Sequence, residues 1–171
     1  ISVLTVYAFS TENWNRSPDE VAALMSIFAR YCDELRVEAL ERNIKILVLS
    51  TESARIPSQV QKGITRMVEE TSHCDGLTMN ICMSYGSRGE IVEASRSLVA
   101  GVLRGELDAS RIDEREFEKR LLTSHCGDPD VLIRTSGEIR ISNFMLWQLA
   151  YTEMFFVEKP WPAMEKRDLL S

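Results

Sequence analysis

The sequence of 171 residues is 44% hydrophobic and 27% charged, with a formal net charge of −6. This balance is typical of one globular domain with a substantial core. Without a run of lysine and arginine we expect no nucleic-acid partner, and no apolar stretch approaches the roughly 20 residues that span a bilayer.

Strand and helix signals alternate along the chain. We predict strands at 3–8, 44–49, 77–84, 131–133 and 154–157, and helices from Ser17 to about Arg36, around 60–68, after the turn 86–89 and around 113–122. Ser17, Pro18 and Glu20 form a predicted capping box. The helix after the turn carries one apolar face, formed by Ile91, Val92, Ser95, Leu98, Val99 and Val102. This alternation predicts an α/β fold, a single domain over 1–171 with a largely parallel sheet covered by helices on both faces.

The cysteines Cys32, Cys74, Cys82 and Cys126 show no paired spacing, which favours free thiols in a reducing compartment. His73 and His125 each precede a cysteine. Adjacent ligands rarely point at one metal ion, so we favour ordinary loop and core roles over a zinc site.

The segment from Val131 to Phe144 suits an anion. A short apolar strand ends in Arg134, a Ser-Gly turn follows, and Arg140 and Ser142 come before the apolar stretch 144–149. Two guanidinium groups, a hydroxyl and a helix beginning after Asn143 would suit a phosphate or diphosphate. From spacing alone, two surface arginines paired with Asp128, Asp130 and Glu138 fit equally well.

A second polar cluster, residues 9–18, follows the strand at 3–8. In open α/β sheets, ligands bind at the carboxyl ends of strands. We therefore expect the two loops to face one pocket.

These two loops resemble the hallmarks of the cis-prenyltransferases, the family of undecaprenyl and dehydrodolichyl diphosphate synthases. Residues 7–16, YAFSTENWNR, are similar to its signature loop, and residues 134–153, RTSGEIRISNFMLWQLAYTE, to its second motif. The resemblance extends over essentially the whole chain in the same order.

The resemblance implies a transferase that condenses isopentenyl diphosphate with an allylic, farnesyl-type diphosphate to make a long-chain cis-polyprenyl diphosphate, assisted by Mg²⁺. It assigns isopentenyl diphosphate binding to the motif residues Arg134, Arg140, Ile141 and Ser142. It assigns substrate contacts to Ser10, Thr11, Glu12, Trp14, Arg16 and Glu20, although Trp14 is also suited to simple packing.

Asn13 matches the polar residue that the family uses near proton removal. A neutral amide is a poor base, so we expect Asn13 to act by positioning. The resemblance makes Glu153 a magnesium ligand, together with an aspartate near the family's N-terminus. Ile139 stands where some bacterial members have a further metal-binding histidine.

The growing hydrocarbon needs an apolar groove at the carboxyl edge of the sheet. We expect Leu24, Met25 and Phe28 to face it, although this helix face could equally pack only the core. The resemblance also implies a homodimer with part of 144–156 in an isologous interface. It further implies a cytoplasmic location, with peripheral association at the membrane where the lipid product is used.

The family's N-terminal strand and its Asp-Gly-Asn-Arg-Arg loop, which holds the allylic diphosphate, are missing from these residues. We therefore expect residues 1–171 alone to bind isopentenyl diphosphate weakly and to transfer prenyl groups negligibly.

Two other classes compete with a catalytic transferase. A non-catalytic partner subunit would be expected to lack the loop with Asn13 and Arg16, which this chain retains. A phosphate-binding hydrolase would be expected to show a glycine-rich phosphate loop or a G-x-S-x-G turn, and neither occurs.

Overall fold

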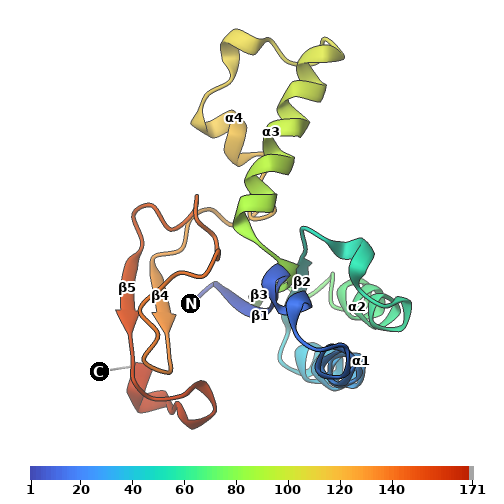
Figure 1. The fold of residues 1–171 in the computed structure, drawn as a ribbon, viewed down its shortest axis with the longest axis vertical. Coiled ribbons are helices and arrows are strands. Elements are labelled where there is room, and N and C mark those ends of the chain that lie inside the picture. Colours follow the sequence, from blue (N-terminus) through green and yellow to red (C-terminus); the bar gives the residue numbers. More distant parts are fainter. Residues whose placement is uncertain (170–171) are drawn as a thin grey trace.

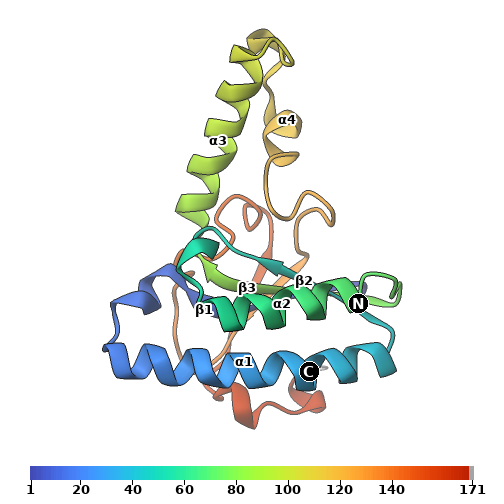
Figure 2. The same cartoon turned by 90° about the vertical axis from the view of Figure 1, so that its right-hand side faces the viewer.

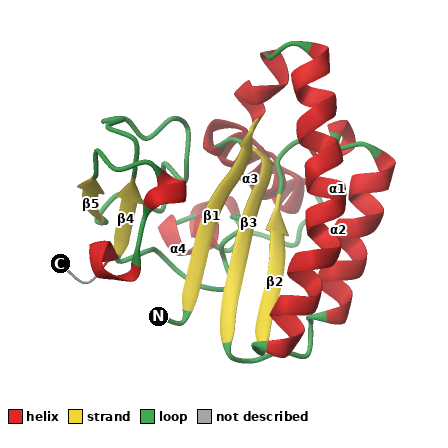
Figure 3. Ribbon diagram, turned by 90° about the horizontal axis from the view of Figure 1, so that it is seen from below, coloured by secondary structure: helices red, strands yellow, loops and turns green. Residues whose placement is uncertain are grey.

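A computed structural model describes residues 1–169 and shows an α/β fold in which every strand pair is parallel. Strands β1 (Val3–Ser10), β3 (Leu77–Tyr85) and β2 (Ile44–Leu49) are seen nearly end-on in Figure 1 and lie side by side in that order (Figure 3). Strands β4 (Val131–Arg134) and β5 (Glu153–Phe156) form a separate parallel pair beside the β1 edge (Figure 3). The predicted parallel sheet is confirmed, but it is divided in two.

Helices α1 (Pro18–Glu41) and α2 (Ser58–Glu70) lie together along one face of the three-stranded sheet. Helix α3 (Ser87–Leu103) projects away from the sheet with the short helix α4 (Glu114–Glu118) beside it (Figure 2). Short 3₁₀ helices occur at Thr11–Asn15, Ser53–Arg55, Ala109–Arg111, Trp161–Ala163 and Lys166–Leu169. Within residues 1–169 no helix is both long and apolar enough to cross a bilayer.

The start of α1 is the capping box that the sequence predicts. The Ser17 Oγ accepts the Glu20 backbone N–H at 3.4 Å, and the Glu20 carboxylate accepts the Ser17 N–H at 3.2 Å. Pro18 occupies the first turn, where its missing N–H costs nothing. The helix continues past Arg36 to Glu41.

The predicted apolar face of α3 is wrong in part. Val92 and Val99 are 48% and 58% exposed. Instead, the carboxylate of Glu90 is buried, where it accepts hydrogen bonds from the Tyr85 hydroxyl at 2.6 Å and the Leu122 backbone N–H at 2.8 Å. A buried carboxylate needs such donors, so its partners decide which side of α3 turns inward. The buried residues of α3 are Ser87, Glu90, Ala94, Leu98 and Gly101.

The helix expected after Asn143 does not form. The backbone φ angles of Ser142, Asn143 and Met145 are +53°, +61° and +46°, values that a right-handed helix excludes. The segment is a series of turns. It packs onto the second face of the three-stranded sheet, where a core cluster is formed by Leu49, Cys82, Tyr85, Phe144, Met145 and Leu149.

Candidate functional site

The first site loop leaves the carboxyl end of β1 as a 3₁₀ helix. The side-chain oxygen of Asn13 accepts the backbone N–H of Ser10 at 2.8 Å. The amide therefore closes the turn that begins this loop, which is a positioning contact made by the side-chain oxygen of Asn13.

Trp14 is packed into the loop. Its indole N–H donates to the Ser84 hydroxyl at 2.8 Å, and its ring meets Phe9 edge-on at 4.8 Å between centroids. The Arg55 guanidinium lies 4.8 Å above the ring centre, a cation–π distance. The geometry of Trp14 fits the packing role. The Glu20 carboxylate accepts a hydrogen bond from the Ser17 hydroxyl at the start of α1, and Arg16 is exposed.

Glu12 is the acidic group of this loop. Its carboxylate accepts hydrogen bonds from the Thr11 hydroxyl at 3.1 Å and from the Asn143 side-chain amide at 2.9 Å. Partial desolvation would raise its pKa, but the hydrogen bonds from Asn143 and the loop outweigh this, so the pKa of Glu12 lies below its ordinary value. The residue is an anion at neutral pH.

The second site loop gathers its two arginines around one carboxylate, and one of them also contacts a hydroxyl. Arg134, at the end of β4, donates to the Ser142 Oγ at 2.9 Å and to the Arg140 carbonyl. The Glu138 carboxylate lies 2.7 Å from the Arg140 guanidinium and 3.8 Å from that of Arg134. Both arginines thus share one carboxylate, as the surface-pair alternative requires, while Arg134 also lies against the Ser142 hydroxyl, as an anion site requires. Ile141 packs against the core cluster of the second sheet face.

The two loops contact each other directly. Besides the bond between Asn143 and Glu12, the Tyr7 hydroxyl donates to the Tyr85 carbonyl at 3.0 Å and approaches the Ser142 carbonyl at 3.5 Å. Sequence reasoning assigned no role to Tyr7 or Asn143. Their positions inside the two motifs are the signal that could have found them.

Glu153 lies apart from the arginine cluster. In the parallel β4–β5 pair it stands opposite Val131, whereas Arg134 stands opposite Phe156. The two positions are three residue steps apart along the strands, a distance of about 10 Å. Glu153 is exposed, and within residues 1–169 no group of three or more His, Cys, Asp or Glu side chains is placed to hold a metal ion. The described residues do not by themselves complete a magnesium site.

An apolar cavity of about 100 Å³ lies between the sheet and helices α1 and α2. Of the three residues expected to face a groove, Phe28 lines it, while Met25 is buried in the neighbouring core and Leu24 packs against that core. The core-packing alternative therefore applies to Leu24 and Met25. The other lining residues are Val6, Ala8, Tyr31, Cys32, Leu35, Val48, Val60, Ile64, Met67, Met79, Ile81 and Met83.

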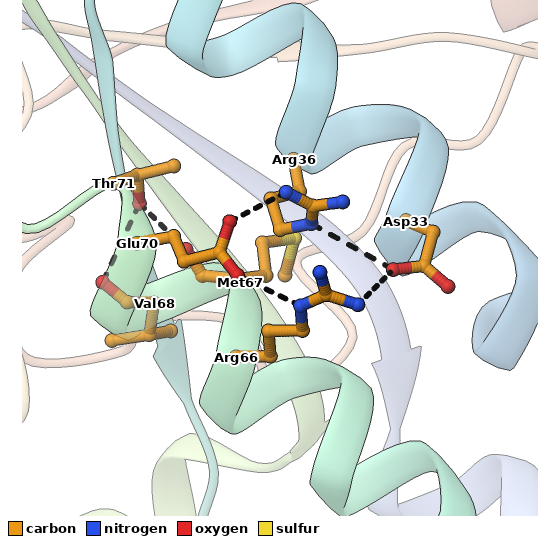
Figure 4. A network of polar contacts seen from close by, with 7 residues as sticks. All are labelled: Asp33, Arg36, Arg66, Met67, Val68, Glu70 and Thr71. Atoms are coloured by element: carbon orange, nitrogen blue, oxygen red, sulfur yellow. Dashed lines mark hydrogen bonds and ion pairs between the residues drawn. The ribbon is translucent and has the colours of Figure 1, made fainter.

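Charged side chains tie α1 to α2 beside this cavity (Figure 4). The Glu70 carboxylate pairs with Arg36 at 2.5 Å and with Arg66 at 2.7 Å, and Asp33 lies 3.7 Å from both guanidinium groups. The four residues form a closed ring. On α1, its members Asp33 and Arg36 lie on either side of the lining residue Leu35 in the sequence.

The chain matches known proteins along its whole length. The family model described as "Putative undecaprenyl diphosphate synthase" matches residues 1–171. Isoprenyl transferases from Listeria monocytogenes and Bacillus subtilis are 41% and 42% identical over 170 residues, 99% of this chain. The chain spans 67% and 65% of those two proteins.

Solved structures share the fold as well as the sequence. Lavandulyl diphosphate synthase from Lavandula x intermedia, in complex with dimethylallyl diphosphate, superposes with a TM-score of 0.94 at 37% identity, covering 99% of this chain and 73% of that one. A probable undecaprenyl diphosphate synthase from Campylobacter jejuni superposes with a TM-score of 0.87 at 34% identity, covering 99% of this chain and 77% of that one. The chain belongs to the cis-prenyltransferase family.

Proposed function

We propose that this protein condenses isopentenyl diphosphate with an allylic, farnesyl-type diphosphate and repeats the step to build a long-chain cis-polyprenyl diphosphate. The observation that carries the proposal is the convergence of Arg134, Arg140 and Ser142 at the carboxyl end of β4, directly against the β1 loop.

The arginine cluster fits the diphosphate of isopentenyl diphosphate. Each guanidinium offers a planar fork of donors, and the Ser142 hydroxyl adds another. Glu138 pairs with both of these arginines. A diphosphate carries more charge than one carboxylate and would take over the arginine donors from Glu138. The Asn13 contact with Ser10 holds the opposite loop in shape for the second substrate.

The apolar cavity fits the growing hydrocarbon. Its lining is almost wholly apolar, and it runs beneath the three-stranded sheet, in which the carboxyl end of β1 carries the first loop. At about 100 Å³ it is smaller than the roughly 300–1,000 Å³ of typical ligand pockets. A long chain would therefore enter by moving α1 and α2 away from the sheet.

Magnesium is the cofactor that we propose for the complete enzyme, with Glu153 as one ligand. Since the described residues do not complete that site, we assign no reaction step to the metal. We further propose a homodimer that acts in the cytoplasm and associates peripherally with the membrane. Tyr151 and Phe155, which are 96% and 52% exposed, support an interface at β5.

The proposal is tested by assaying the full-length gene product with Mg²⁺, farnesyl diphosphate and radiolabelled isopentenyl diphosphate. After dephosphorylation, reversed-phase chromatography should show label in alcohols of increasing chain length, and none when farnesyl diphosphate is omitted. Failure to incorporate label, by a protein that is folded and binds both substrates, would contradict it.

A further inference from the structure

Asn143 sits where three parts of the chain meet. Its side-chain oxygen accepts the backbone N–H of Arg88 at 2.8 Å, and its carbonyl accepts the N–H of Ser87 at 2.8 Å. Its amide nitrogen donates to the Glu12 carboxylate at 2.9 Å. One residue thus joins the turn after β4, the beginning of α3 and the loop after β1.

The surroundings leave little freedom at this junction. A Cβ atom on Gly86 would lie 2.7 Å from the Asn143 amide nitrogen and 2.6 Å from the Thr11 hydroxyl, so any larger residue here would push these two side chains out of place. Asn143 itself has a φ of +61°, a left-handed conformation that asparagine tolerates better than most residues.

Ser142 immediately precedes Asn143 and receives the hydrogen bond from Arg134. The place of the Ser142 hydroxyl is therefore set by a turn whose anchors are Asn143 and Ser87, because the Ser87 hydroxyl also accepts the Leu146 backbone N–H at 2.8 Å. A shift of this turn would move the hydroxyl away from Arg134.

We propose that Asn143 is a positioning residue that couples the two substrate loops, holding Glu12 and the Ser142 turn in one geometry for diphosphate binding. An asparagine amide supplies both the acceptor that Arg88 needs and the donor that Glu12 needs, which no carboxylate can do. This inference rests on the proposed isopentenyl diphosphate site.

The test is a double-mutant cycle read by calorimetric titration of isopentenyl diphosphate. Asn143→Asp keeps the acceptor for the Arg88 N–H but sets a second anion against Glu12. Affinity should fall by about tenfold, the worth of one lost charge-assisted contact. Adding Glu12→Gln removes the repulsion, so the double variant should bind within about threefold of Glu12→Gln alone.

The chain offers a matched control at Asn43. This residue has a φ of +56°, its amide donates to the Asp75 carboxylate at 2.9 Å, and its oxygen accepts the Asp75 backbone N–H at 3.2 Å. It lies between α1 and β2, at the amino end of the sheet. Asn43→Asp should lower the melting temperature while leaving isopentenyl diphosphate affinity unchanged.

The outcomes distinguish failure of the positioning role of Asn143 from failure of the proposed isopentenyl diphosphate site. Wild-type affinity in Asn143→Asp, or a loss that Glu12→Gln does not restore, overturns the positioning role while the proposed site stands. A wild-type protein that does not bind isopentenyl diphosphate overturns the site, and the positioning role with it. If Asn143→Asp fails to fold, Glu12→Ala breaks the same bond from the other loop: hydrogen exchange over 140–146 should then quicken, and unchanged exchange overturns the coupling.

Discussion

The Arg134 guanidinium donates to the Ser142 hydroxyl at 2.9 Å across the turn that joins β4 to the segment packed on the sheet. This bond holds the guanidinium group and the hydroxyl side by side. Preorganised donors of this kind bind an anion without the cost of ordering them first.

The first prediction concerns that hydroxyl. Ser142→Ala removes one ligand donor and the contact that orients Arg134, so isopentenyl diphosphate should bind about fivefold to tenfold more weakly, or about 1–1.5 kcal/mol. Calorimetric titration measures the change. Ser95→Ala, which removes an exposed α3 hydroxyl bonded to the Ile91 carbonyl, is the control and should leave affinity unchanged. Equal affinity in both variants would argue against the site.

A second prediction separates the cavity from the core beside it. Phe28→Trp adds volume to a residue that lines the cavity and should shorten the polyprenyl product of the full-length protein. Leu24→Trp, on the same helix but outside the lining, should lower stability by about 1–3 kcal/mol without changing product length. Chromatography of the dephosphorylated products measures the chain length that each variant makes. The same product distribution from Phe28→Trp and wild type would contradict a hydrocarbon site here.

The sequence and the structure agree best where the signal is local. The strand from Ile44 to Leu49 is predicted with its observed bounds, because a short β-branched run preceded by a turn needs no distant partner. The capping box of Ser17 and Glu20 is likewise predicted correctly, because its two residues are only three positions apart. The two loops meet as the sequence predicts, but not at one sheet edge, because β1 and β4 lie in different sheets and the contact runs through Asn143 and Glu12.

The differences arise where distant residues decide. Glu90 turns its face of α3 inward because Tyr85 and Leu122 supply donors, and helical periodicity does not contain that information. The left-handed backbone at Asn143 depends on contacts with another element. The distance of Glu153 from Arg134 follows from the register of β4 on β5, which an apolar pattern leaves open.

A third prediction concerns the ionic ring between α1 and α2. The hydrogen bond from Arg66 lowers the pKa of Glu70 below its ordinary 4.5, desolvation opposes this, and Arg36 adds to the lowering. Because the folded pKa is the lower one, the stabilisation is complete above pH 4.5 and is lost as pH falls through the folded pKa. The stability difference between wild type and Glu70→Gln should therefore shrink on acidification.

Urea unfolding at a series of pH values measures this difference. Glu93→Gln, in the exposed pair of Glu93 with Arg96 on α3, is the control and should change stability by less than about 1 kcal/mol. If the difference in unfolding free energy between wild type and Glu70→Gln stays constant as the pH is lowered below the folded pKa of Glu70, the stabilising role of the ring is contradicted.

A fourth prediction concerns assembly. Phe144 and Leu149 are buried within their own chain, whereas Tyr151 and Phe155 are exposed. The proposed isologous interface therefore narrows to the second half of 144–156. Phe155→Lys should convert a dimer to a monomer in sedimentation velocity at micromolar concentration, while Leu103→Lys, at the exposed end of α3, should not. A wild-type monomer under these conditions would refute the interface.

The central claim is that the two arginines of the second loop hold the diphosphate of isopentenyl diphosphate. Calorimetric titration of wild type, Arg134→Ala and Arg140→Ala with isopentenyl diphosphate tests it most directly, with Arg96→Ala as the control for loss of an exposed charge. Each site variant should lose about 1.5–3 kcal/mol of binding free energy while keeping its fold, and the control should match wild type. Unchanged affinity in both site variants would contradict the claim.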